Sequence, residues 1–403
     1  MSSKILLFIS IALIAAGLLV LRFQYASREL TIGLVVLKGT VQDDPKVKDQ
    51  STYFNFQGYQ IITYLYPKIS YGDVISLDGE ANEKGFISYP KIEKLDRKDN
   101  LRTFLFTIRS NIDKKINKFL PEPQASLLSG VLLGIDKGLP DDFQEDLRTT
   151  GTIHVVVVSG YNIMLVGGFF LLLSGAIKRK YAVTLSIIAI IFYTLLTGAQ
   201  PPTIRAAIMG TLAFSATILG RQNLPFYSLM LAGFLMLMID PFTLNDIGFQ
   251  LSFMATAGII LFKDMLFNYL KRIPSPIGED LTTTIAAQLL VVPIIFFHFG
   301  QVSLVSALVN ALVLWTIPLA TILGFGVAAF GLIVEPLGQF IAWIAWVPLS
   351  IFTWVVQAFA RIPFAQIQVP RSNIFPPLIY YTAVGIFIFL INRYVRIYKK
   401  KSK

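Results

Sequence analysis

The chain is a series of long apolar runs separated by short polar or Gly/Pro-rich breaks, and only its first quarter departs from this pattern. The runs expected to cross a bilayer are 5–21, 152–174, 181–196, 204–219, 225–239, 244–262, 281–297, 303–334, 340–359 and 376–391. A helix needs roughly 20 apolar residues to span the hydrocarbon core, and many of these runs approach or exceed that length. The pattern predicts a polytopic α-helical membrane protein with about ten transmembrane helices.

The run 303–334 is long enough for two passes, because Pro318 near its middle could end one helix. Basic residues favour cytoplasmic loops, and they cluster at 178–180, 221, 263, 271–272 and 393–403. Two passes would place the basic tail outside the cell. We therefore expect one long broken pass, with one end or its middle re-entrant.

The same charge pattern predicts that both termini lie in the cytoplasm. Lys4 and Arg22 flank the first apolar run, and no small-residue cleavage site follows it. We interpret residues 1–28 as a retained membrane anchor and residues 393–403 as a basic cytoplasmic tail. Residues 29–96 then lie on the extracytoplasmic side of the membrane.

Residues 29–96 carry dense charge and short apolar runs, which is typical of strands rather than of membrane helices. Strand patterns occur at 32–41, 51–57, 59–66 and 73–81, with Gly, Asp, Asn and Lys between them. They predict a small extracytoplasmic β-barrel or partial barrel. The segment 71–80 resembles the strand pattern of oligonucleotide/oligosaccharide-binding (OB) folds.

Aromatic residues in this β domain are candidates for DNA binding, because every base offers a face on which an exposed ring can stack. The candidates are Tyr53, Phe54, Phe56 and Tyr59. The alternative is that these rings fill the core, since alternating aromatics in a barrel this small suit its interior.

Residues 97–150 predict a helical connector before the multi-helix domain of residues 151–392. From 97 to 120, apolar residues recur at helical spacing among Arg and Lys, as in an amphipathic helix at a membrane surface or against a neighbouring domain. The run 125–135 is apolar but too short to span, and a turn rich in Gly, Asp and Pro follows it. Such a segment is typical of a re-entrant or interfacial element.

Composition narrows the class of protein. Of the 403 residues, 54% are hydrophobic and 15% are charged, which does not suit a soluble surface. The chain has no cysteine and two histidines, which excludes disulfides, thiolate metal sites and multi-histidine metal centres. It has no GxxxxGK[ST] loop, so it should not hydrolyse nucleoside triphosphates. We expect neither an enzyme nor a cofactor. The net charge of +11 suits basic cytoplasmic loops or a polyanionic partner.

Polar side chains recur inside the apolar runs, where burial in hydrocarbon is costly unless they face protein or a hydrated cavity. They include His154, Ser159, Asn162, Arg205, Asp246, Gln250, Gln288, His298 and Asn310. On one helix, Ser159 and Asn162 share a face, and His154 lies about 80° from Asn162. This arrangement predicts one wall of a polar path through a membrane.

Each of these residues also has a simpler interpretation. Ser159 and Asn162 suit hydrogen bonds between packed helices, Arg205 could snorkel to the interface, and Asp246 could cap a helix. Together, polar groups in five segments favour a hydrated interior. A nucleophile–base pair of His154 and Ser159 is disfavoured, because the two lie about 140° apart on a helix and lack a third member.

Four motifs in order resemble the ComEC-type competence family, the inner-membrane channel for DNA uptake in natural transformation. They are LLSGVLLGIDKGLPDDFQEDLRTTGTIHVVVVSGYNI, LLTGAQPPTIRAAIM, IGFQLSFMATAGIILF and AAQLLVVPIIFFHFGQVSLVSALVNALVLWTIP. The resemblance covers about residues 127–318 and extends more loosely to the β domain, where the family has an OB-type fold.

The resemblance implies a bacterial cytoplasmic-membrane channel that passes one DNA strand into the cytoplasm. Residues that match polar positions of the family motifs are Asp136, His154, Ser159, Arg205, Gln250, Ser252, Gln288, His298 and Asn310. Asn162 departs from the motif, because many relatives have histidine there. We take these residues, with Asn162 and Asp246, as candidates to line the path.

The resemblance also implies partners besides single-stranded DNA and membrane lipids. Without an NTPase motif, the chain would need a cytosolic ATP-driven motor, and a separate DNA receptor is expected. Many relatives carry a C-terminal metallo-β-lactamase-like domain that this sequence lacks, so we expect a separate nuclease. Two alternatives stay open: a small-molecule or lipid-precursor transporter on the same scaffold, and a non-catalytic membrane scaffold of a competence complex.

Overall fold

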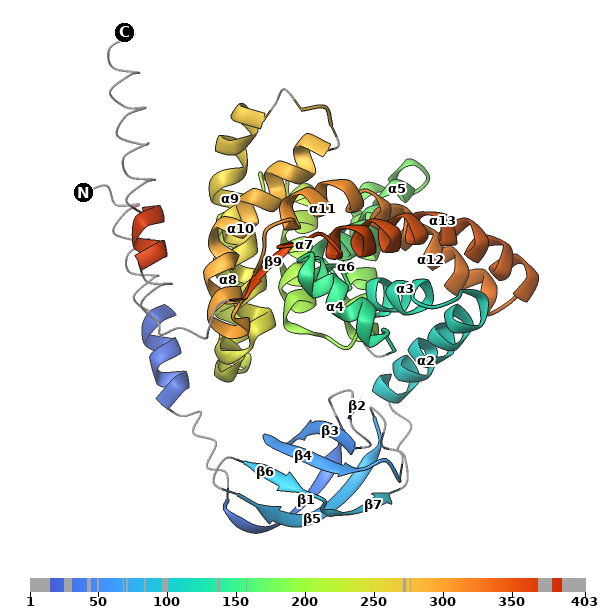
Figure 1. The fold of residues 1–403 in the computed structure, drawn as a ribbon, viewed down its shortest axis with the longest axis vertical. Helices are drawn as coiled ribbons and strands as arrows, with labels where there is room; N and C mark the ends of the chain where they lie inside the picture. Colours follow the sequence, from blue (N-terminus) through green and yellow to red (C-terminus); the bar gives the residue numbers. More distant parts are fainter. Residues whose placement is uncertain are drawn as a thin grey trace. The chain divides into compact units, whose positions relative to one another are not determined.

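The computed structural model describes residues 15–24, 31–41, 45–48, 51–67, 69, 72–82, 85–95, 101–135, 138–156, 158–270, 273–275, 277–368 and 379–385. Two compact units form, residues 1–114 and 115–403 (Figure 1). The candidate Asp136 and the basic tail 393–403 lie outside the described residues. The division into five segments, with its membrane anchor and tail, stays a prediction.

The first unit contains one curled seven-stranded sheet. Its strands are β1 (Gly33–Thr40), β2 (Lys46–Lys48), β3 (Ser51–Phe56), β4 (Tyr59–Tyr64), β5 (Val74–Ala81), β6 (Phe86–Ser88) and β7 (Lys91–Leu95). The order is β1-β5-β6-β4-β3-β2, with β7 also paired to β5. The four predicted strands are confirmed as β1, β3, β4 and β5, whereas β2, β6 and β7 were not predicted. A curled sheet agrees with the partial-barrel expectation, and its kinship to OB folds stays a prediction.

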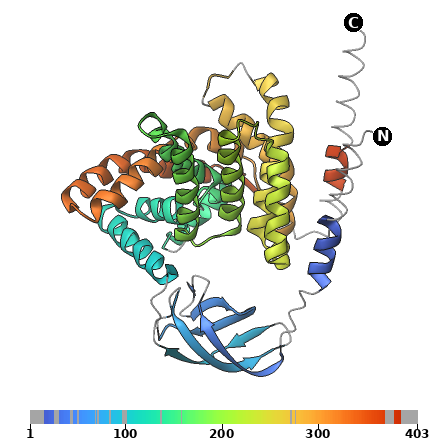
Figure 2. The ribbon, with the colours of Figure 1, turned by 180° about the vertical axis from the view of Figure 1, so that it is seen from behind.

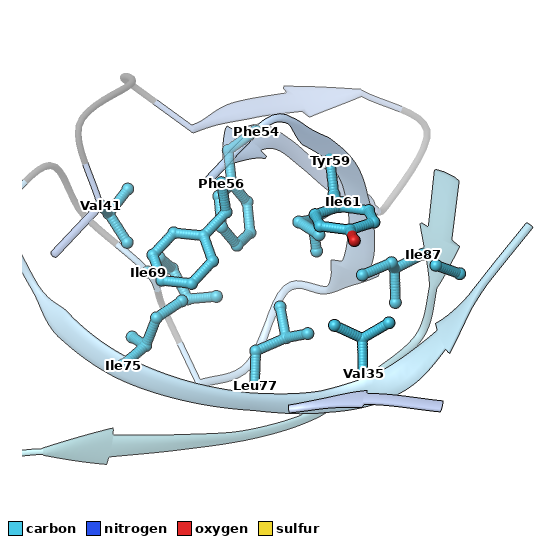
Figure 3. Packing of buried hydrophobic residues seen from close by; sticks show 11 residues of the cluster. Val35, Val41, Phe54, Phe56, Tyr59, Ile61, Ile69, Ile75, Leu77 and Ile87 are labelled. Carbon is cyan, nitrogen blue, oxygen red and sulfur yellow. The ribbon is translucent and has the colours of Figure 1, made fainter. Parts of the chain in front are cut away.

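The core of this sheet is built from alternate residues of its strands, because successive side chains point to opposite faces. Ile75 and Leu77 on β5 are fully buried, as is Ile87 on β6. They pack in one cluster with aromatic rings of β3 and β4, as Figure 3 shows.

Three of the four aromatic candidates fill the core, which is the alternative to DNA binding that the sequence left open. The exposed fractions of Phe54, Phe56 and Tyr59 are 5%, 2% and 5%, and all three belong to the core cluster (Figure 3). Their rings therefore stabilise the sheet and offer no face for a base. Tyr53 lies on the opposite face of β3 and is 37% exposed, so it alone of the four stays a stacking candidate.

The second unit is helical, and the helix α2 leads into it. The boundary between the units falls inside α2 (Leu101–Phe119). The helices that follow are α3 (Gln124–Leu133), α4 (Asp141–Thr149), α5 (Gly160–Leu172), α6 (Arg179–Leu196), α7 (Pro201–Ile218), α8 (Pro225–Ile239), α9 (Ile247–Leu270), α10 (Ile277–Phe299), α11 (Ser306–Val313), α12 (Thr316–Gly331) and α13 (Glu335–Ala360). Short strands β8 (Gln301–Ser303) and β9 (Gln366–Gln368) pair antiparallel. The amphipathic helix predicted from residue 97 is confirmed as α2.

Three groups of neighbouring helices pack closely within this unit. The green helices α5, α6 and α7 pack together, α9 packs along α10, and α12 packs along α13, as both ribbon views show (Figures 1 and 2). Among the described residues, five helices are long and apolar enough to cross a membrane, or six if the bent pair α11 and α12 is one span. The full count of about ten stays a prediction.

The run 303–334 forms a broken segment, as expected, but the break differs from the predicted one. Helices α11 and α12 meet at an angle of 46° around Leu314 and Trp315. Pro318 lies in the first turn of α12, where a helix does not use the missing N–H group. It therefore fits the start of a helix rather than the middle of a split one.

The run 152–174 is not one continuous helix, which corrects the face assigned to its polar residues. A short 3-10 helix covers Ile153–Val155, and α5 begins only at Gly160. Ser159 lies before α5 with extended backbone (φ −88°, ψ 162°). His154 and Asn162 are therefore on different helices, and the angles calculated for a single helix do not apply to them.

Candidate functional site

Helix α3 is a short apolar helix that ends inside the protein. All of its residues from Ala125 to Leu133 are buried. Gly134 ends it in the left-handed conformation (φ 68°), and a Cβ there would lie 3.2 Å from the Thr197 carbonyl oxygen. A buried helix end leaves carbonyl groups that must find donors within the protein.

Side chains from neighbouring helices supply those donors. Asn162 Nδ2 on α5 donates to the Val131 carbonyl at 2.7 Å, and the Tyr193 hydroxyl on α6 donates to the Leu132 carbonyl at 2.8 Å. The other end of the Asn162 amide accepts a hydrogen bond from Thr321 on α12 at 3.4 Å. Asn162 is 1% exposed and bonded at both ends. This favours the helix-packing interpretation for Asn162 over a place on a path.

A second polar pair joins α9 to α10. His298 Nε2 lies 3.1 Å from Gln250 Oε1, and Gln250 Nε2 donates to the Leu244 carbonyl at 2.9 Å. Both side chains are half-buried. The structure therefore brings two predicted residues, 48 positions apart in the sequence, into direct contact.

A third cluster joins α10 to α11. Gln288 Nε2 donates to the Ser306 hydroxyl at 2.8 Å, and Asn310 Nδ2 lies 3.4 Å from the same oxygen. Asn310 is 2% exposed, and its Oδ1 has no hydrogen-bond partner among the described residues. A Cβ on Gly151 would lie 2.6 Å from the Ser306 hydroxyl oxygen, so the segment before α5 packs directly against this cluster.

The remaining candidates occupy separate places. His154 Nδ1 lies 3.1 Å from the Gly151 carbonyl oxygen. Asp246 accepts the Phe249 N–H at 2.7 Å and so caps α9, as the simpler interpretation expected. The Ser252 carbonyl accepts from the Thr256 hydroxyl at 2.9 Å, while Arg205 on α7 donates to that same hydroxyl.

Sequence reasoning missed Tyr193 and Ser306, which bond directly to the candidate region. Tyr193 lies in an apolar run, where a tyrosine is easily counted as one more hydrophobic residue. Ser306 lies four residues before Asn310, one helical turn away, so its spacing was the available signal.

Most of this helical unit matches a known protein family. The model of the "Competence protein" family matches residues 131–394. The chain belongs to the competence protein family. The resemblance found in its motifs is thereby confirmed, and the match includes every candidate from Asp136 to Asn310.

Three relatives are longer than this competence protein, whose matched residues cover 29%, 40% and 28% of their lengths. It is 25% identical over 227 residues to ComE operon protein 3 of Bacillus subtilis (strain 168), covering 56% of this chain and 29% of that protein. It is 33% identical over 172 residues to an uncharacterized protein of Aquifex aeolicus (strain VF5), covering 42% and 40%. It is 26% identical over 218 residues to the uncharacterized protein YcaI of Escherichia coli (strain K12), covering 50% and 28%. No solved structure matches the chain.

Proposed function

We propose that this competence protein conducts a single DNA strand across the bacterial cytoplasmic membrane during natural transformation. The observation that carries the proposal is the family match over residues 131–394, which spans the helices that bear the polar candidates. A competence role requires DNA to cross a layer that rejects charge. The polar side chains of α9, α10 and α11 are the groups of this chain that could contact the charged strand in place of lipid.

The chemistry of these contacts suits transient binding of a polyanion. Gln250, Gln288 and Asn310 are neutral amides that donate hydrogen bonds without fixing a charge. A conduit must bind well enough to admit a strand and weakly enough to release it. Gln250 and Gln288 are only half-buried; Gln250 is bonded to the Leu244 carbonyl and to His298, and Gln288 is bonded to the Ser306 hydroxyl. Their present partners can be exchanged for phosphate oxygens as the strand passes.

The rest of the process needs other components. A single strand carries one negative charge per nucleotide, so its movement through the membrane needs a driving force. The proposal assigns that force to a cytosolic ATP-driven motor, capture to a separate receptor, and digestion of the other strand to a separate nuclease. Of the four aromatic candidates in the β unit, Tyr53 is the one that would meet the strand.

The proposal predicts the fate of labelled DNA in a naturally transformable strain that lacks this chain. We expect label outside the membrane but none in the cytoplasm, for both single-stranded and duplex donors. Wild-type complementation should restore cytoplasmic label. Full cytoplasmic label in the deletion strain would contradict the proposal and favour the small-molecule transporter.

A further inference from the structure

Helices α5 and α7 run parallel, and the start of α5 lies against the second turn of α7. A Cβ on Gly160 would lie 3.3 Å from the Cβ of Ala206, and one on Gly210 would lie 3.7 Å from Ile163. One turn further on, a Cβ on Gly167 would meet the ring of Phe214 at 2.6 Å. Contacts that advance in step along both helices place their N-terminal ends at the same end of the pair.

The N-terminus of α5 carries no side-chain cap. Ser159 occupies the capping position, but its hydroxyl makes no capping hydrogen bond. The Asn162 N–H donates to the Ser159 carbonyl at 3.1 Å, so the N–H groups of Gly160 and Tyr161 are the ones that a ligand could use. The helix dipole adds partial positive charge there. Helix α9 begins nearby, since a Cβ on Gly248 would lie 3.7 Å from the Pro202 ring. Its N-terminus is different because Asp246 already caps it.

Arg205 adds a full positive charge at the open end of α5. Its Nη2 lies 3.6 Å from the position of a Cβ on Gly160. The partners of its guanidinium in the described part of the chain are the Thr256 hydroxyl and the Met209 sulfur, at 3.8 Å for the latter, and its buried Nε has none. No carboxylate of the described residues pairs with it. An anion that joins a guanidinium and a positive helix end is attracted by both.

Thr203 supplies a further uncommitted polar group. Its side chain is fully buried, and its hydroxyl has no hydrogen-bond partner among the described residues. It lies three residues before Ala206 and therefore on the face of α7 that meets the start of α5. Buried hydroxyls are normally hydrogen-bonded, so this one is available to donate to a ligand.

We propose that the N-terminus of α5, Arg205 and Thr203 form a binding site for one phosphodiester group. Helix N-termini bind phosphate through their N–H groups, and a guanidinium binds two of its oxygens at once. The inference rests on the proposed function for the source of the phosphodiester, a DNA strand. A phospholipid headgroup carries the same group, so the test separates the two sources.

Binding to the purified full chain in phosphatidylcholine nanodiscs tests the site. The probes are a fluorescent 20-nucleotide oligothymidylate and its uncharged methylphosphonate counterpart, followed by anisotropy. We expect Arg205→Gln to weaken oligothymidylate binding about tenfold or more, because a hydrogen bond to a charged group is lost. Arg205→Lys should bind between the two. The methylphosphonate probe should bind weakly to both wild type and Arg205→Gln.

Two further variants guard against misinterpretation. Thr203→Val keeps the shape and charge of the side chain. It should weaken oligothymidylate binding by about threefold, because a hydrogen bond from a neutral hydroxyl contributes less than one from a charged guanidinium. Arg221→Gln removes an exposed arginine beyond the end of α7 and should leave binding within about twofold of wild type, as expected for an exposed charge.

Distinct outcomes separate this site from the proposed function. Tight binding by wild type that Arg205→Gln and Thr203→Val leave unchanged would overturn the site and leave the DNA path standing. A second arm uses nanodiscs that contain both phosphatidylglycerol and phosphatidylcholine. Absence of oligothymidylate binding to wild type, together with Arg205-dependent enrichment of phosphatidylglycerol around the protein in these mixed nanodiscs, would support the phosphodiester site but overturn DNA as its source.

Discussion

Replacing both Gln250 and Gln288 with leucine is expected to abolish DNA uptake in cells while the protein stays folded and inserted. The two amides lie on α9 and α10 and are half-buried in helices that are largely apolar. Each lost hydrogen bond to a passing phosphate removes about 1.5–3 kcal/mol of stabilisation. Two such losses raise the barrier by about 3–6 kcal/mol, which slows transfer by about a hundredfold or more.

The control for this double variant is Gln339→Leu. Gln339 is also a half-buried amide, but its Nε2 donates to the Phe119 carbonyl at 3.0 Å at the start of α13. Uptake by Gln339→Leu should stay close to that of wild type, with equal amounts of each protein in the membrane fraction. Unchanged uptake by the double Gln250/Gln288 variant would remove both residues from the path.

Breaking the buried end of α3 is expected to be the most damaging change to stability. Asn162→Leu and Tyr193→Phe remove the donors to two adjacent buried carbonyl groups, those of Val131 and Leu132. Leaving a buried acceptor without a partner costs about 1–3 kcal/mol, so the double variant should lose about 2–6 kcal/mol of unfolding free energy. The total free energy of unfolding of a native protein is about 5–15 kcal/mol, so this loss is a large fraction of it.

The thermal unfolding midpoint of the purified protein in detergent measures this effect. Tyr181→Phe is the matched control, because Tyr181 lies on the same helix α6 and is 61% exposed. It should unfold at the wild-type temperature. If Tyr193→Phe also unfolds there, the hydroxyl does not support the end of α3. A double variant that loses uptake in proportion to its folded amount would agree with a packing role for Asn162.

The longer strands of the sheet follow from local sequence patterns. Alternation of apolar and polar residues located β1, β3, β4 and β5, because each strand has one buried face. Strands β2 and β6 have three residues each, too few for such a pattern to be recognised. Whether the aromatic rings of β3 and β4 faced the core depended on how the sheet curls, which is a non-local property.

The candidate site was predictable in its members more than in their grouping. Polar residues in apolar runs identified Gln250, His298 and Gln288, but only tertiary contacts pair Gln250 with His298 and Gln288 with Ser306. The face that was predicted for His154 and Asn162 assumed one helix. The chain instead leaves helical geometry before Gly160, where extended backbone at Ser159 begins α5 afresh.

Cross-linking of a stalled DNA strand tests the central claim most directly. The 403 residues contain no cysteine, so Gln250→Cys, Gln288→Cys and Trp343→Cys each introduce a single reactive thiol. Trp343 is 64% exposed on α13 and serves as the position off the path. The probe is a single strand with bromoacetamide groups on its backbone and streptavidin at its trailing end. We predict covalent attachment at positions 250 and 288 and none at 343. Equal attachment at all three, or attachment at 343 alone, would contradict a DNA path through these helices.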